Sequence, residues 1–144
     1  MITIIHAENE WQRAGVHYVR TQAMIRGFGV RLDQEFDERD TPETKYILAL
    51  DGRLPVGTCR LHILDGGRAK IERVCVLEEY RGKGVGRQVV AGAEEWLKSF
   101  GVNDVIITSR DEAVGFYEKL GYTADYANTD DSGVFKTIYT EKKI

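Results

Sequence analysis

The sequence predicts an α/β domain with a mixed, mostly antiparallel central sheet flanked by about four helices. Apolar residues recur with strand and helix periods in the order strand, helix, three strands, helix, strand, helix and two strands. Only the unit over 69–108, a strand, a glycine-rich loop, a helix and a strand, has the length of a parallel crossover. Because no linker or repeat divides the 144 residues, we expect one domain, 1–144.

The composition argues against several classes of function. A net charge of −3 is not typical of a general nucleic-acid binder, which needs a basic surface. Cys59 and Cys75 lack metal-ligand spacing and His6, His17 and His62 form no constellation, so no metal is predicted. No apolar stretch is typical of a leader or a membrane span. We therefore expect a cytoplasmic protein with reduced thiols and no membrane partner.

The N-terminal part is expected to form a strand over 1–7 and a helix that runs to about Met24. Asn9 and Gln12, three residues apart, are typical of a helix N-cap pair. An irregular connection with room for a helical turn follows over 27–45 and is rich in acids. These acids are Asp33, Glu35, Asp37, Glu38 and Asp40. They would suit a cationic acceptor, but a run of charge is usually a solvated face, and we favour that interpretation.

Three strands are expected next, over 45–50, 55–64 and 69–77, joined by turns that contain Asp and Gly. The antiparallel pairing of the last two would place Cys59 and Cys75 on neighbouring strands. In a reducing compartment we expect two small buried apolar residues and not a disulfide.

A helix is expected from Val85 to Phe100, because its apolar residues keep a helical period and Gly101 suits the position that ends a helix. A short apolar strand over 104–108 follows.

Ser109 and Glu112 form a capping-box pattern, which predicts that a further helix begins there and ends at Gly121. Two final strands are expected over 122–127 and 134–142, with a loop between them.

The loop before the long helix is rich in glycine. It consists of Arg81, Gly82, Lys83, Gly84, Val85, Gly86 and Arg87. Free N–H groups and the dipole at a helix start attract anions, and the missing Cβ atoms allow a phosphate to lie on the peptide groups. The spacing matches neither the P-loop nor the dinucleotide fingerprint, whose third glycine would stand at Arg87. A tight turn that needs glycine only for its dihedral angles is the alternative.

Two motifs together resemble the GNAT superfamily of acetyl-coenzyme A dependent N-acetyltransferases. Residues 81–86 match its R/Q-x-x-G-x-G/A motif, and "AVGFYEKLGY" over 113–122 is similar to its second motif, with one helix and one strand between the two. The resemblance covers 71–122, while "VRTQAMIRGFGV" is similar to a small bacterial, ElaA-like branch. It implies a GNAT-like fold, acetyl-CoA as co-substrate, and acetyl transfer to a primary amine of a small molecule or peptide.

The resemblance also implies where coenzyme A binds. The pyrophosphate would rest on the loop over 81–87, and the pantetheine would pair with the strand edge near Val74, Cys75 and Val76. A bulge in this strand would free an N–H that stabilises the oxyanion. Many members have an asparagine where this chain has Arg110, so that coenzyme contact is not carried over.

Two residues are candidates for proton transfer. Tyr117 stands where the family places the group that protonates the sulfur of coenzyme A; the alternative is a packing tyrosine. Glu72 matches a position where relatives often hold an acid, which would accept the amine proton. An ion pair of Glu72 with Arg60 or Arg73 on the sheet is an equal alternative.

Other functions remain open at this point. A non-catalytic module that senses acyl-CoA would need the same coenzyme site, and a structural domain with an incidental glycine turn would need none. Neither the acceptor nor the oligomeric state, including a homodimer, follows from the sequence.

Overall fold

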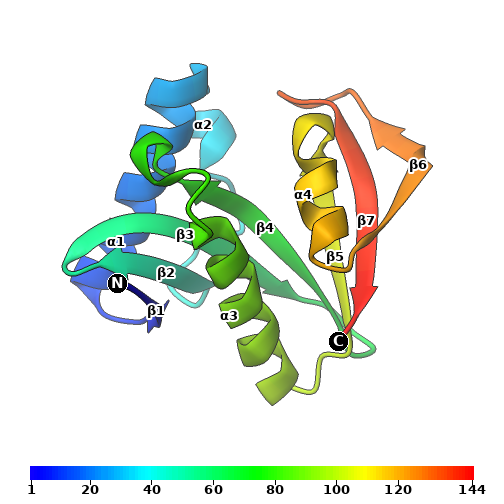
Figure 1. Ribbon diagram of the computed structural model, residues 1–144, viewed down its shortest axis with the longest axis horizontal. Coiled ribbons are helices and arrows are strands. Elements are labelled where there is room, and N and C mark those ends of the chain that lie inside the picture. The colour runs from blue at the N-terminus through cyan, green and yellow to red at the C-terminus, as the bar shows by residue number, and fades with distance from the viewer.

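The computed structural model describes residues 1–144 as one seven-stranded sheet in the order β1-β2-β3-β4-β5-β7-β6 (Figure 1). The strands are β1 Ile2–Ala7, β2 Lys45–Asp51, β3 Leu54–Ile63, β4 Arg68–Val76, β5 Asp104–Arg110, β6 Thr123–Asp130 and β7 Thr137–Lys143. Neighbouring strands are antiparallel except for β4 and β5, which are parallel. The predicted fold class, with its single parallel unit, is therefore confirmed.

Four α-helices and three shorter or irregular helical segments flank the sheet. They are α1 Glu10–Arg20, the π-helical segment η1 Thr21–Arg26, α2 Leu32–Glu35, the 3-10 turn η2 Glu78–Tyr80, α3 Val85–Ser99, the 3-10 turn η3 Asp111–Ala113 and α4 Val114–Lys119. Every helix is too short or too polar to span a lipid bilayer.

Different helices cover the two faces of the sheet. Gly57 of β3 lies under Val85 and Val89 of α3, and a Cβ at this glycine would come within 3.0 Å of Val85. On the opposite face, Gly15 of α1 packs so closely on β2 that a Cβ would lie 3.2 Å from Leu48. We call these the α3 face and the α1 face. Side chains alternate between them along each strand.

The sheet opens between its two parallel strands. β4 and β5 pair at three positions only, Arg68 with Asp104, Ala69 with Val105 and Lys70 with Ile106. Beyond these pairs the strands diverge, and Figure 1 shows β5 and β7 leaning away from β4 with α4 beside them. The crossover between the two strands is α3, whose apolar residues Val85, Val89, Val90, Ala93 and Leu97 are buried.

The first helix has the expected cap. Gln12 N–H donates to the Asn9 side chain at 3.1 Å, and Asn9 N–H donates back to the Gln12 side chain at 3.1 Å, which confirms the predicted pair. The helical backbone continues past Met24 to Arg26 as η1.

The capping box predicted at Ser109 and Glu112 is wrong. Ser109 lies within β5 opposite Ile138 of β7, and its hydroxyl donates to the carbonyl oxygen of Arg110 at 2.7 Å. Strand pairing outweighs the local capping pattern there, and α4 begins only at Val114, after a 3-10 turn. The last two strands are separated by 131–136, because β6 extends further than the sequence predicted.

Candidate active site

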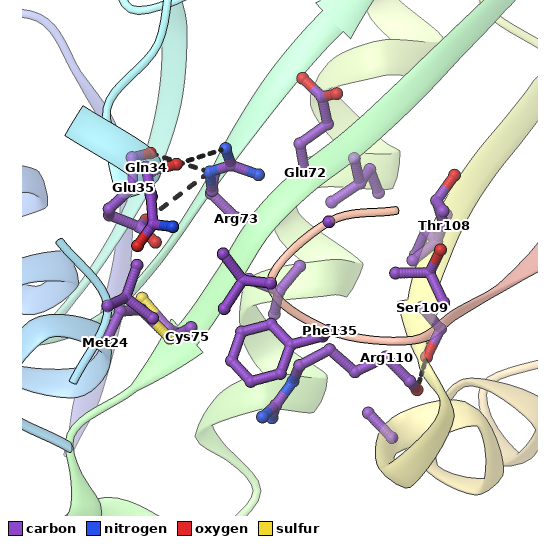
Figure 2. A pocket seen from close by; sticks show the side chains of 18 of the residues that line it. Met24, Gln34, Glu35, Glu72, Arg73, Cys75, Thr108, Ser109, Arg110 and Phe135 are labelled. Carbon is purple, nitrogen blue, oxygen red and sulfur yellow. Dashed lines mark hydrogen bonds and ion pairs between the residues drawn. The ribbon is translucent and has the colours of Figure 1, made fainter. Parts of the chain in front are cut away.

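A cavity of about 640 Å³ lies in the opening between β4 and β5. Side chains from both strands, η1, α2, α4 and the loop between β6 and β7 line it (Figure 2). The opening passes through the sheet, so that groups from its two faces share one cavity.

The strand register assigns the β4 side chains to the two faces. Leu48, which packs under α1, pairs with Thr58, and Thr58 pairs with Cys75, so the Cys75 side chain lies on the α1 face. Glu72 is on the same face, because its partner Arg60 is two residues from Thr58.

The β5 side chains divide in the same way. Val105 pairs with Ala69, a residue of the α3 face, so Ile107 and Ser109 follow Val105 onto that face. Thr108 and Arg110 therefore belong to the α1 face, where both line the cavity.

The glycine loop presents free backbone donors at the start of α3. None of the N–H groups of residues 82–87 donates a hydrogen bond to another backbone group. Gly82 and Gly84 have φ angles of 73° and 81°, which favour glycine. A Cβ at Gly86 would lie 3.2 Å from the ring of Phe116. The close approach of bare peptide groups at a helix N-terminus fits a diphosphate.

The edge of β4 that faces the cavity has no strand partner beyond Lys70, and at its end the Val76 carbonyl oxygen accepts a hydrogen bond from Arg81 Nε at 3.2 Å. The expected bulge is present: Arg73 and Val74 fall in the register shift between Glu72 and Cys75, and Arg73 has a φ angle of 54°. A bulge leaves an unpaired residue in the ladder, and its N–H is then available to a ligand.

Tyr117 of α4 reaches the cavity from the α3 face. Its side chain is 6% exposed, and its ring lies 6.0 Å from that of Tyr122, whose hydroxyl donates to Glu94 of α3 at 2.7 Å. No hydrogen bond within the chain engages the Tyr117 hydroxyl. Burial, with a smaller contribution from the nearby Cys59, raises the pKa of Tyr117. The phenol therefore keeps its proton at neutral pH and can donate it.

Both cysteines are free and buried, as expected. Figure 2 shows Cys75 beside Met24 of η1, at the α1 side of the cavity. Burial raises the pKa of Cys75 to about 12, so its thiol is protonated at neutral pH and is a poor nucleophile.

Glu72 is held in ion pairs. Its carboxylate accepts hydrogen bonds from Arg39 and, at 3.2 Å, from Arg60. Burial opposes ionisation, but the hydrogen bond from Arg39 and the charge of Arg60 outweigh it and lower the pKa of Glu72. The ion-pair alternative is the one that matches this geometry, although the partner is Arg39 in addition to Arg60 and not Arg73.

The acidic connection does not form the solvated face that we favoured. Glu35 is 3% exposed and pairs with Arg20 at 2.9 Å, while Asp40 bridges Arg20 at 2.6 Å and Arg60 at 3.0 Å. Asp37 pairs with Arg60 at 2.8 Å and, at 3.1 Å, with Arg73, so of the five acids only Asp33 and Glu38 are exposed. Buried guanidinium groups need such partners, and the acids supply them.

Eight ion-paired residues form what we call the arginine–carboxylate network. Its members are Arg20, Arg39, Arg60, Arg73, Glu35, Asp37, Asp40 and Glu72. The four positive and four negative charges balance, and the network lies on the α1 face beside the cavity. Figure 2 shows its Glu35 and Arg73 joined at the cavity wall. No group of three or more His, Cys, Asp or Glu residues is arranged to hold a metal ion.

Comparison with known proteins identifies the family. The model of the acetyltransferase (GNAT) family matches residues 7–122. The chain belongs to the GNAT acetyltransferase family. It is 35% identical to the uncharacterized N-acetyltransferase YjcF of Bacillus subtilis over 116 residues, 81% of each chain. It is also 37% identical to the uncharacterized protein YyaT of the same organism, over 86% of this chain and 84% of that protein.

Solved structures share the whole GNAT fold. A protein from Lactobacillus plantarum assigned as an N-acetyltransferase superimposes with a TM-score of 0.91 and 31% identity, over 99% of this chain and 97% of that one. Escherichia coli ElaA, with a TM-score of 0.82 and 20% identity over 99% and 100% of the two chains, shares the fold. The resemblance to this family, and to ElaA in its fold, is thus confirmed, and the protein is an N-acetyltransferase of the GNAT family.

Several lining residues of this GNAT protein had no signal in the sequence. Met24 comes from η1, Gln34 comes from α2, and Phe135 comes from the loop between β6 and β7. They lie far apart in sequence, and no local motif marks them. Arg110, noted in the sequence only as a departure from the family asparagine, lines the cavity as well.

Proposed function

We propose that this N-acetyltransferase moves the acetyl group of acetyl-CoA to a primary amine of a small molecule or peptide by direct attack in a ternary complex. The observation that carries the proposal is the opening through the sheet. Tyr117 reaches the cavity from the α3 face, and Glu72 and Thr108 reach it from the α1 face. A donor and an acceptor that enter from opposite faces would therefore meet in the cavity.

The donor would bind along the α3 side. Bare N–H groups of 82–87 would hold its pyrophosphate, with Arg81, Lys83 and Arg87 supplying positive charge. Its pantetheine would pair with the free edge of β4 at Val74, Cys75 and Val76, as an added strand does. A GNAT-fold neighbour from Thermoplasma acidophilum, the PaiA N-acetyltransferase, was crystallised with coenzyme A, at 18% identity and a TM-score of 0.72.

The residues of the chain would then act on the reaction in three places. Acetyl-CoA supplies an activated thioester. An N–H of the bulge at Arg73 and Val74 would donate to the developing oxyanion. The Tyr117 hydroxyl, which keeps its proton, would donate to the departing sulfur.

In this proposal Glu72 does not act as the general base. Because its pKa is lowered, its carboxylate binds a proton weakly. We propose that its carboxylate, already paired with Arg39 and Arg60, orients the amine by accepting a hydrogen bond from it at the α1 side of the cavity, and that the amine loses its proton to water.

A thiol-release assay tests the proposal. The protein is mixed with acetyl-CoA and a panel of amines, and free coenzyme A is measured over many turnovers. Steady, amine-dependent release with formation of the N-acetyl product is the expected result. Saturable binding of acetyl-CoA by calorimetry without release for any amine would overturn it and would favour the sensing module.

A further inference from the structure

Arg110 is the charged residue at the cavity that the chain leaves without a partner. The other guanidinium groups near the α1 face of the opening, those of Arg20, Arg39, Arg60 and Arg73, each pair with a carboxylate. Arg110 pairs with none, although it lines the cavity. Its Nη1 is buried and has no hydrogen-bond partner. A buried guanidinium nitrogen without an acceptor is costly unless a ligand supplies one.

Two aromatic rings fix the position of this guanidinium. Its Cζ lies 4.9 Å from the ring centroid of Phe28 and 5.1 Å from that of Phe135. The two rings contact each other edge to face, with centroids 5.7 Å apart. Figure 2 shows the Arg110 side chain extended along Phe135 into the cavity. Rings stabilise a cation but offer no hydrogen-bond acceptor, so the planar donors stay available.

The β5 register places Arg110 on the α1 face, although its guanidinium lies 4.9 Å from the Phe28 ring, which Arg81 of the glycine loop also contacts at 5.7 Å. Arg110 faces the α1 side of β5, whereas Ile107, Ser109 and Tyr117 contribute to the α3 side. On the α1 side it shares the cavity with Glu72. Glu35 also lines this side, so the acceptor would find two ion-paired carboxylates and one unpaired guanidinium on the same face.

We propose that the acceptor is an amine that also carries an anionic group, a carboxylate or a phosphate, and that Arg110 binds this group. The proposal rests on the proposed function and names the substrate class for it. A guanidinium with open donors binds either oxyanion in a bidentate manner. The arginine–carboxylate network nearby adds no net charge, so Arg110 decides whether the site prefers an anionic or a neutral amine.

Matched pairs of amines test this inference in the thiol-release assay. Phenylalanine is compared with phenethylamine, tyrosine with tyramine, and phosphoethanolamine with ethanolamine. The wild type should turn over the anionic member of at least one pair with a kcat/KM at least about tenfold higher. The pair in which the preference occurs distinguishes carboxylate from phosphate.

Arg110→Met is the test variant, because methionine keeps an apolar stem against Phe28 and Phe135 and removes the charge. It should abolish the preference by raising KM for the anionic amine, with the Kd of acetyl-CoA unchanged by calorimetry. Lys136→Met, at an exposed position next to Phe135, removes the same charge outside the cavity and should keep the preference. Arg110→Lys keeps the charge and should retain part of it.

Each other outcome overturns the inference. Turnover of the panel without a preference for anionic amines excludes it and leaves the proposed function intact. A tenfold or larger loss of acetyl-CoA affinity in Arg110→Met would instead assign Arg110 to the coenzyme. Binding of acetyl-CoA with no turnover of any amine would remove the proposed function and this inference with it.

Discussion

The two sides of the opening between β4 and β5 differ in whether backbone groups or side chains line them. On the α3 side, the proposed coenzyme contacts are mainly backbone groups of one short segment, from the β4 edge through the glycine loop. On the α1 side, the wall is made of charged side chains from several elements, joined in the arginine–carboxylate network. A site made of backbone depends on where glycine is allowed, whereas a site made of side chains depends on partners far apart in the chain.

We therefore expect the two sides to respond to different changes. Local strain or a misplaced Cβ would damage the α3 side without unfolding the protein. Removal of one charge from the α1 side leaves its partners buried and uncompensated. The predictions below separate the two.

The largest effect is expected on the α1 side, from Arg60→Met. Arg60 is fully buried and pairs with Asp37, Asp40 and Glu72. Its loss should lower the free energy of unfolding by about 3–5 kcal/mol, because three carboxylates lose their shared partner. Urea denaturation measures this change.

Two further variants calibrate that result. Adding Asp37→Asn to Arg60→Met should recover part of the loss, because it removes one uncompensated charge. Arg31→Met breaks the exposed pair with Asp33 and should leave stability unchanged within error. A loss below about 1 kcal/mol for Arg60→Met would contradict the structural role of the network.

The next effect concerns turnover. Tyr117→Phe keeps the ring and removes the hydroxyl that we place at the sulfur. We expect kcat to fall about 10²-fold, the low end for proton donation because a thiolate is already a good leaving group, while the Kd of acetyl-CoA stays constant. Single-turnover kinetics measures it.

Tyr122→Phe is the matched control for this change. The Tyr122 hydroxyl donates to Glu94 and not into the cavity, so its loss should lower stability and spare kcat. An unchanged kcat in Tyr117→Phe, with chemistry limiting the rate, would show that its hydroxyl is only structural.

On the α3 side, Gly84→Val and Gly86→Val should weaken acetyl-CoA binding more than tenfold, about 1.4 kcal/mol. A branched side chain would lie where the pyrophosphate is proposed to rest, and at Gly86 it would also meet Phe116. Calorimetric titration of folded variants measures the affinity.

Gly101→Val separates this loss from backbone strain. Gly101, beyond the other end of α3, has a φ angle of 83°, close to the 81° of Gly84. It should lose stability as Gly84→Val does and bind acetyl-CoA normally. Equal affinity losses in both variants would remove the loop from the coenzyme site.

A smaller effect is expected at acid pH. Despite their burial, hydrogen bonds from Arg60 to Asp37 and from Arg20 to Asp40 lower the pKa of both carboxyls below their unfolded values. Their stabilisation is therefore complete above about pH 4 and is lost as the pH falls through the folded pKa values, by up to about 1.4 kcal/mol per pH unit per group. Urea denaturation from pH 6 to pH 2 should show this slope. Asp40→Asn should flatten it, and an unchanged slope in that variant would rule out this source.

The smallest effect is expected from Cys75→Ala. Its thiol is protonated at neutral pH and packs beside Met24, so most turnover should remain. Intact mass spectrometry after mixing with acetyl-CoA should detect no acetyl-enzyme. A stable adduct that disappears in Cys75→Ala would assign the thiol a covalent role.

The same difference, between backbone contacts and side-chain contacts, explains how much of each side could be predicted from the sequence. The spacing of Gly82, Gly84 and Gly86 follows from backbone geometry, so one segment was enough to predict the loop and the helix after it. Ser109 failed as a cap because its pairing with β7 involves a strand almost 30 residues later. The burial of Asp40 depends on Arg20 and Arg60, and no periodicity in the sequence links these three positions.

The three residue pairs between β4 and β5 have a consequence for the molecule as a whole. These pairs are the only strand pairing between the two halves of the sheet, β1–β4 and β5–β7. Along the chain, the two halves are joined by the segment that contains α3. A molecule lodged along the free edge of β4 would touch both halves and resist their separation. A bound molecule would then hold the two halves of the sheet together. We expect the enzyme to be most rigid while the cavity is occupied and most flexible immediately after the bound molecule is released.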